Sequence, residues 1–208
     1  MRKLIELIID EAMELSGIDA VSVVENPAIE ENFIALKAEQ KEYKFAEVVG
    51  EKRLLIGALL VPDKPIYRKD EEHGEYDIFF SKDTIRHCVE LYAKNGNHNN
   101  TTFEHEQNVQ GLVMTESWIV EDAEMDKSKF YNLNVPVGTW CGTMKVNNDV
   151  IWNDYVKTGK VKGFSIEGYF ADRAKLPLSK IEDDSIIDAE IEAGLTLLEI
   201  KQLINGTK

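Results

Sequence analysis

The sequence predicts a strand-rich α+β fold, and two observations support this prediction. Most segments able to form a core either alternate apolar and polar residues or are short apolar runs closed by glycine or proline, as strands do. A smaller number repeat apolar residues at helical spacing. The chain has 208 residues, of which 43% are hydrophobic, and this is enough to bury the core of one domain with appendages.

Strands are expected along most of the chain between residues 18 and 170. The run from Leu54 to Val61 is nearly all apolar, which is typical of a strand buried on both faces, and Pro62 ends it. The charged residues 67–74 and 122–129 are expected to form loops. The other predicted strands are residues 18–24, 33–36, 43–49, 75–80, 109–121, 138–146 and 162–170.

The clearest predicted helix follows Ser81, a good N-cap, and ends near Gly96. Its buried stripe contains Cys88, whose simplest role is that of a small core residue. The other predicted helices are residues 2–15, a short segment capped by Asn148 or Asp149, and residues 191–204.

Composition limits the function classes. The net charge of −14 opposes a polyanion partner, because contacts to phosphates are built from clustered Lys and Arg, so nucleic-acid binding is not expected. No apolar run is long enough to cross a bilayer, and two cysteines indicate a reducing compartment rather than a disulfide framework. We expect a cytosolic protein with an N-terminal helix (residues 1–17), a main domain (18–175) and an acidic helical tail (176–208).

The chemistry is expected on the strand at residues 162–170. Successive side chains of a strand point to opposite faces, so Ser165 and Glu167 share one face. The apolar residues Phe164, Ile166 and Phe170 form the other face, toward the core. Gly163 and Gly168 flank the serine. Glycine in a strand marks a bulge or the close approach of another backbone, such as that of a peptide substrate.

Glu116 interrupts the apolar face of another predicted strand, residues 109–121. A buried carboxylate without a partner is costly and has a raised pKa, so a bonding partner is expected if this side chain is buried. The alternatives are a bulge that turns Glu116 outward, or a strand face that is only half covered.

The residues by themselves leave three candidate sites open. In the first, Ser165 is a nucleophile, His105 is its general base and a carboxylate orients the imidazole, because a serine hydroxyl needs a base to become reactive. In the second, a metal ion is held by Glu104, His105, Glu106 and the nearby His98. No common zinc-binding spacing supports that site. In the third, Cys141 pairs with His105, although a thiol on a strand is more often inert packing.

A series of short blocks carries a family resemblance. The blocks include TESWIV at residues 115–120 and GKVKGFSIEG at residues 159–168. The others are residues 24–30, 61–63, 74–76, 79–81, 104–105, 138–140 and 152. Taken in the order in which these blocks follow one another along the chain, from about Ile18 to Phe170, the sequence resembles the phage prohead (capsid maturation) proteases of the XkdF type.

The resemblance implies a serine endopeptidase without cofactor or metal. It implies the fold shared by phage prohead proteases and herpesvirus assemblins, a small, mostly antiparallel β-barrel flanked by helices. Ser165 would be the nucleophile and His105 the base. The third member would be Glu116 or, alternatively, Glu167, since the herpesvirus branch uses a second histidine and this chain has none after His105. Arg173, the first arginine after the serine, is a candidate for supporting an oxyanion loop.

The resemblance also implies partners and a location. Such a protease would cleave scaffold and capsid protein, with the portal as a further option, inside the procapsid in the host cytoplasm, without nucleic-acid or membrane partners. The tail would dock on scaffold or be removed by self-cleavage. Assembly of the chain into a homo-oligomer is a further option. The alternatives are a non-catalytic capsid-assembly protein and a metal-dependent hydrolase that uses His105 with Glu104 and Glu106.

Overall fold

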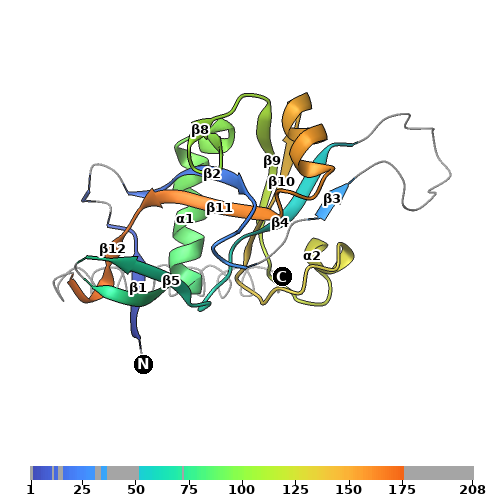
Figure 1. Cartoon of the computed structure of the whole chain (residues 1–208). Helices are drawn as coiled ribbons and strands as arrows, with labels where there is room; N and C mark the ends of the chain where they lie inside the picture. Colours follow the sequence, from blue (N-terminus) through green and yellow to red (C-terminus); the bar gives the residue numbers. More distant parts are fainter. Residues whose placement is uncertain are drawn as a thin grey trace, which may run out of the picture. The chain divides into compact units, whose positions relative to one another are not determined.

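The computed structural model describes residues 2–10, 12–13, 16–30, 34–36, 52–71 and 73–175 (Figure 1). The chain divides into two compact units, Met1–Ala171 and Asp172–Lys208, and the strands that carry the candidate site lie in the first unit. The strand predicted at residues 43–49 and the tail helix predicted at residues 191–204 lie outside the described residues.

The described strands form three four-stranded sheets. The first has the order β12 (Ala171–Asp172), β1 (Lys3–Ile8), β6 (Gly74–Phe79), β5 (Ile66–Asp70). The second has the order β3 (Ile34–Leu36), β4 (Leu54–Leu60), β10 (Trp140–Val146), β9 (Leu112–Ile119). The third has the order β11 (Gly163–Tyr169), β2 (Gly17–Val24), β7 (Thr101–Phe103), β8 (Gln107–Asn108). With few helices beside them, these sheets confirm a strand-rich α+β fold.

The closed barrel that the family resemblance implies is not what the described strands form. β1 pairs with β6, and β2 with β7, in parallel. β10 pairs with β4 and β9, and β11 pairs with β2, in antiparallel orientation. The described strands therefore belong to separate mixed or antiparallel sheets. Alternation along a strand specifies which face is buried, but it does not specify which other strand lies at its edge.

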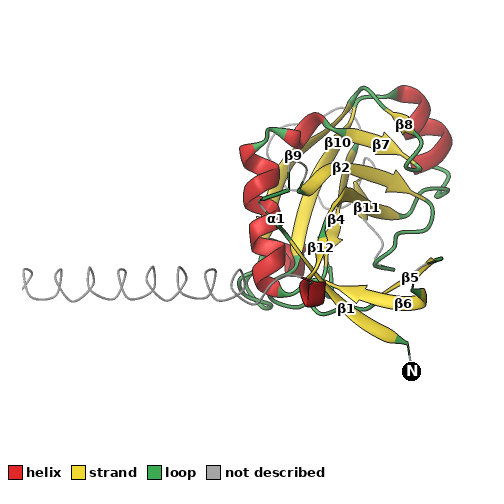
Figure 2. Ribbon diagram, turned by 90° about the vertical axis from the view of Figure 1, so that its left-hand side faces the viewer, coloured by secondary structure: helices red, strands yellow, loops and turns green. Residues whose placement is uncertain are grey.

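Helix α1 (Lys82–Lys94) confirms the helix predicted after Ser81. The Ser81 hydroxyl accepts a hydrogen bond from the Thr84 backbone N–H at 3.4 Å, as an N-cap does, and Cys88 is buried. The helix packs against β2 and β10 (Figure 2). The other helical elements of the described residues are short, namely η1 (Asn97–Asn99), α2 (Lys127–Phe130), η2 (Ile151–Val156) and η3 (Arg173–Lys175).

Two predictions about the first sheet are wrong. The helix predicted for residues 2–15, and with it the helical segment at residues 1–17, is wrong because β1 lies there. The loop predicted for residues 67–74 contains most of β5. Both strands pair with β6, which lies about 70 residues away from β1 in the chain. For β1, this distant partner supplies backbone hydrogen bonds that overrule a local helical pattern. β5 instead forms a hairpin with β6, so its charged side chains belong to a strand.

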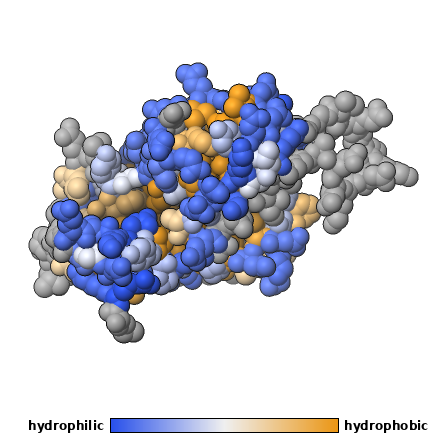
Figure 3. Space-filling model, viewed as in Figure 1, coloured by the Kyte–Doolittle hydropathy of each residue, from blue (hydrophilic) through white to orange (hydrophobic). Residues whose placement is uncertain are grey.

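The buried core joins the second and third sheets. Leu55 and Leu59 on β4, Trp140 on β10 and Phe164 on β11 belong to one buried cluster. β4 is buried along nearly its whole length, which confirms the prediction from its apolar run. In Figure 3, hydrophilic residues cover most of the visible described surface, and hydrophobic residues show between them.

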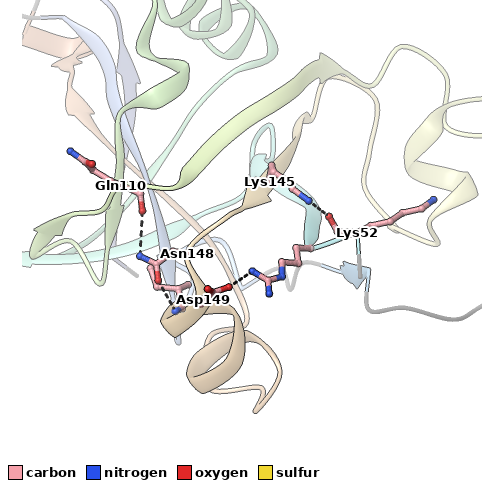
Figure 4. A network of polar contacts seen from close by, with 7 residues as sticks. Lys52, Gln110, Lys145, Asn148 and Asp149 are labelled. Carbon is pink, nitrogen blue, oxygen red and sulfur yellow. Dashed lines mark hydrogen bonds and ion pairs between the residues drawn. The ribbon is translucent and has the colours of Figure 1, made fainter. Parts of the chain in front are cut away.

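The π-helical turn η2 is fixed at its start by a polar network (Figure 4). The Asn148 side chain accepts from the Ile151 backbone N–H at 3.0 Å and donates to the Gln110 carbonyl at 3.3 Å. Asn148 is therefore the cap of the predicted short helix. Within this turn, the Tyr155 ring lies edge-on to the ring of Phe103 with centroids 4.7 Å apart. The turn thus supports the last residue of β7.

Gly168 brings the backbones of β11 and β2 into close approach. A Cβ atom at this position would lie 2.2 Å from the Gly17 carbonyl oxygen, and the strand register shifts between Glu167 and Gly168. The predicted irregularity at this glycine is therefore confirmed, and the approaching backbone is β2 rather than a peptide substrate. On the other side of the shift, Ser165 lies directly opposite Ser22.

Candidate active site

The third sheet aligns three hydroxyl side chains across neighbouring strands. Ser165 on β11 is paired with Ser22 on β2, and Ser22 is paired with Thr102 on β7. Side chains of paired residues in adjacent strands point to the same face of a sheet. Glu167 follows two residues after Ser165, about 6.6 Å along the strand, and shares that face. Ser22 is 0% exposed and Ser165 is 7% exposed, so the row lies beneath the surface.

His105 lies in the strained turn between β7 and β8. Glu104 and His105 have φ values of 51° and 59°, and the Glu106 backbone N–H donates to the Phe103 carbonyl at 3.1 Å. Positive φ at both central residues is the pattern of a type I′ turn, which favours asparagine and glycine. Larger residues are strained there, and such strain persists only where the surrounding structure holds it.

Three hydrogen bonds tie this turn to β2 and to the residue after it. The His105 backbone N–H donates to the Ser22 hydroxyl at 3.1 Å. The Glu104 backbone N–H donates to the Val23 carbonyl at 3.3 Å. The Glu104 carboxylate accepts from the Glu25 backbone N–H at 2.7 Å. Because β2 also pairs with β11, the turn is fixed relative to the serine strand.

The imidazole of His105 lies against the Glu167 carboxylate. The distance between His105 Nδ1 and Glu167 Oε1 is 3.1 Å, and the Thr102 hydroxyl donates to the same oxygen. The side chains of His105 and Glu167 are 43% and 31% exposed, so solvent and substrate can reach them. A carboxylate at Nδ1 favours the tautomer with its proton on Nδ1, and this leaves Nε2 free to act as a base.

Ser165 and His105 are brought to the same sheet face, but they are not hydrogen-bonded in the described part of the chain. The Ser165 hydroxyl has no hydrogen-bond partner among those residues. The imidazole contacts β11 at Glu167, which lies two residues after Ser165 on the same face of the strand. Hydrogen bonds between nucleophile and base are often long without substrate and tighten when it binds.

Glu116 lies in the second sheet, on β9. The pairing of β9 with β10 skips Thr115, so a bulge turns Glu116 outward, and its side chain is 53% exposed. Its carboxylate forms an ion pair with Lys127. The hydrogen bond and the positive charge of Lys127 lower the pKa of Glu116. The bulge alternative is therefore confirmed, and the raised pKa expected for a buried side chain does not arise.

The residues of the candidate metal site make contacts elsewhere and do not converge on one point. Glu104 binds the backbone at Glu25, and His105 pairs with Glu167. The His98 ring packs against Tyr92 with ring centroids 5.4 Å apart. Within the described ranges, no group of three or more His, Cys, Asp or Glu side chains is arranged to hold a metal ion.

Two further candidate residues, Cys141 and Arg173, lie outside the third sheet. Burial raises the pKa of the Cys141 thiol to about 12, so the thiolate needed for a nucleophile is scarce at neutral pH. Arg173 opens η3 and belongs to the second unit, and its role in supporting an oxyanion stays a prediction.

Two residues at this site were missed by sequence reasoning. Ser22 and Thr102 contact the turn and the carboxylate directly. Both look like ordinary polar residues of predicted strands or loops, because their meaning depends on the cross-strand register. The alternation within residues 18–24 could have shown only that Ser22 differs from its apolar neighbours.

A serine, an imidazole and a carboxylate on one sheet face define a candidate site of the Ser-His-acid hydrolase class. Residues 44–174, more than half of the chain, match the family described as "Putative phage serine protease XkdF". The chain therefore belongs to this family of phage serine proteases. No curated protein and no solved structure matches it significantly. Among the described residues, no helix has the length and apolar character needed to span a membrane.

The Glu116–Lys127 ion pair should make stability depend on pH. The folded-state pKa of Glu116 is lowered, so its contribution is present above the unfolded-state pKa of about 4.3 and is lost as the pH falls through the folded-state pKa. Because the pair is half exposed, we expect it to contribute less than about 1 kcal/mol to the free energy of unfolding. Urea unfolding of wild type and Glu116→Gln between about pH 7 and pH 3 measures this contribution to stability. An identical pH dependence in the two proteins would contradict this assignment.

Proposed function

We propose that this chain is a serine endopeptidase of phage capsid maturation. In this proposal Ser165 is the nucleophile, His105 the general base and Glu167 the carboxylate that orients the imidazole. The observation that carries it is the 3.1 Å contact between His105 Nδ1 and Glu167 Oε1 on the sheet face that bears Ser165. Membership of a phage serine protease family supports the reaction class.

The proposed mechanism follows from this arrangement. The Ser165 Oγ attacks the carbonyl carbon of the scissile peptide bond while its proton passes to Nε2 of His105. The Glu167 carboxylate stabilises the imidazolium that forms. His105 then gives the proton to the departing amine, which leaves an ester on Ser165. Water, deprotonated by the same imidazole, cleaves the ester and restores the serine.

Glu167 is preferred to Glu116 as the third member because of their contacts. A carboxylate can fix the tautomer of an imidazole only when it lies within hydrogen-bond distance of the ring. Glu167 meets this condition, whereas Glu116 lies in another sheet and forms an ion pair with Lys127.

The proposed substrates are the phage scaffold and capsid proteins, with the portal as a further substrate, and the place of action is the procapsid in the host cytoplasm. The match to a family of phage serine proteases supports a phage setting for this proposal. Removal of part of the chain's own tail belongs to the same proposal. A homo-oligomer is compatible with it.

We expect Ser165 to react covalently with a fluorophosphonate probe, which needs no known substrate. Intact-mass spectrometry should show one adduct on wild type and none on Ser165→Ala. His105→Ala should slow labelling by about a hundredfold or more, because general-base catalysis contributes roughly 10²–10⁴-fold. Ser117→Thr, a change on β9 that keeps the hydroxyl bonded to Trp140, is the matched control and should label normally. A folded wild type without an adduct would favour the non-catalytic assembly protein.

The two candidate carboxylates can be separated by the same change at each. Glu167→Gln should slow probe labelling at least tenfold, because the amide no longer stabilises the imidazolium. Glu116→Gln should label at the wild-type rate, since its carboxylate contacts Lys127. The reverse result would restore Glu116 to the site.

Self-cleavage should be visible in the mass of the expressed protein. We expect wild type to lose part of its C-terminal tail, while Ser165→Ala keeps its full mass. The measurement uses freshly purified protein and protein held for increasing times at fixed temperature. Equal masses throughout would count against self-cleavage and would leave cleavage of other phage proteins to be assayed directly.

A further inference from the structure

We propose that two buried hydroxyls, those of Thr102 and Ser22, are positioning residues for the His105–Glu167 pair, an inference that rests on the proposed function. Thr102 holds the carboxylate and Ser22 holds the backbone of the histidine. Neither hydroxyl would touch the substrate's reacting atoms. Each acts through the residue that it binds.

The Thr102 hydroxyl determines where the Glu167 carboxylate lies. It donates to Oε1, which is also the atom that faces His105 Nδ1. A glutamate side chain has several rotatable bonds, and the last of them is only loosely restricted. Thr102 is buried on β7 and its β-branched side chain is stiff at χ1, so it is a fixed donor. Without this donor, the carboxylate would occupy orientations that leave Nδ1 unpaired.

Ser22 stabilises the turn that presents His105. Its hydroxyl accepts the His105 backbone N–H at 3.1 Å, directly at one of the two residues with positive φ. A strained backbone keeps its conformation only when surrounding contacts hold it. Ser22 lies on the central strand β2, is 0% exposed and faces Ser165 across the strand pair. It therefore holds the histidine at a set position relative to the nucleophile.

The two hydroxyls come from paired positions on neighbouring strands. Ser22 and Thr102 are opposite each other in the parallel pairing of β2 with β7. One strand thus fixes the histidine turn and the next fixes the carboxylate, while β11 supplies Ser165 and Glu167. If Thr102 had only a structural role, replacing it with valine would leave the site unchanged, because valine fits a buried strand position as well as threonine does.

The test uses two changes at Thr102 that differ in what they keep. Thr102→Val keeps the shape and removes the hydroxyl, whereas Thr102→Ser keeps the hydroxyl and removes a methyl group. We expect Thr102→Val to slow fluorophosphonate labelling of Ser165 about tenfold or more, the effect of losing one hydrogen bond to a charged group. Thr102→Ser should stay within about threefold of wild type. Urea unfolding checks that each variant is folded.

A second readout does not depend on activity. The nitrogen chemical shifts of the His105 ring report which ring nitrogen carries the proton. We expect the Nδ1–H tautomer to dominate in wild type and Thr102→Ser, and a mixture of tautomers in Thr102→Val and in Glu167→Gln. Ser22→Ala should also slow labelling and disturb these shifts, and it tests the second hydroxyl independently.

The outcomes separate this inference from the proposed function. If Thr102→Val labels at the wild-type rate and keeps the wild-type tautomer, the role of Thr102 is overturned while the peptidase assignment stands. If wild type does not label at all, the peptidase assignment fails, and the tautomer alone decides the inference. A tautomer that changes in Thr102→Val and not in Thr102→Ser then supports positioning, and an unchanged tautomer refutes it.

Discussion

The candidate site depends on the register of three neighbouring strands, β11, β2 and β7. This register places Ser165, Ser22 and Thr102 side by side, so the hydroxyls of three distant chain segments share one face. The contact between His105 Nδ1 and Glu167 Oε1 is then possible, because the turn after β7 reaches across β2 to β11. A slip of one residue in either pairing would turn the serine or the threonine to the opposite face.

The strained turn and the close strand approach both support this register. Glu104 and His105 adopt positive φ, and hydrogen bonds to β2 hold the turn in that conformation. At the other end of the serine strand, Gly168 allows β11 to approach Gly17 more closely than any larger residue would. The strained turn therefore holds the histidine, and the close approach at Gly168 lies on the strand that carries the serine.

The carboxylates show how local patterns can mislead. Glu116 stands out in the sequence because it breaks an apolar alternation, which leaves open a buried side chain with a partner or a side chain turned outward. A bulge at Thr115 removes the anomaly by turning the side chain toward Lys127 and solvent. Glu167 gives a weaker signal in the sequence, only its position two residues after Ser165. Yet it is the acid that meets the histidine, since register and turn geometry bring the two together.

Local patterns by themselves determined the strand-rich α+β character, the buried strand β4, the capped helix α1 and the shared face of Ser165 and Glu167. Each of these follows from alternation, helical spacing or a cap, which involve residues close together in the chain. Tertiary structure decided that β1 is a strand, that separate sheets form, that Glu167 and Ser22 contact His105, and that Thr102 contacts Glu167. These features depend on pairing between segments far apart in the chain, and a side-chain pattern specifies the face of a strand without specifying its partner.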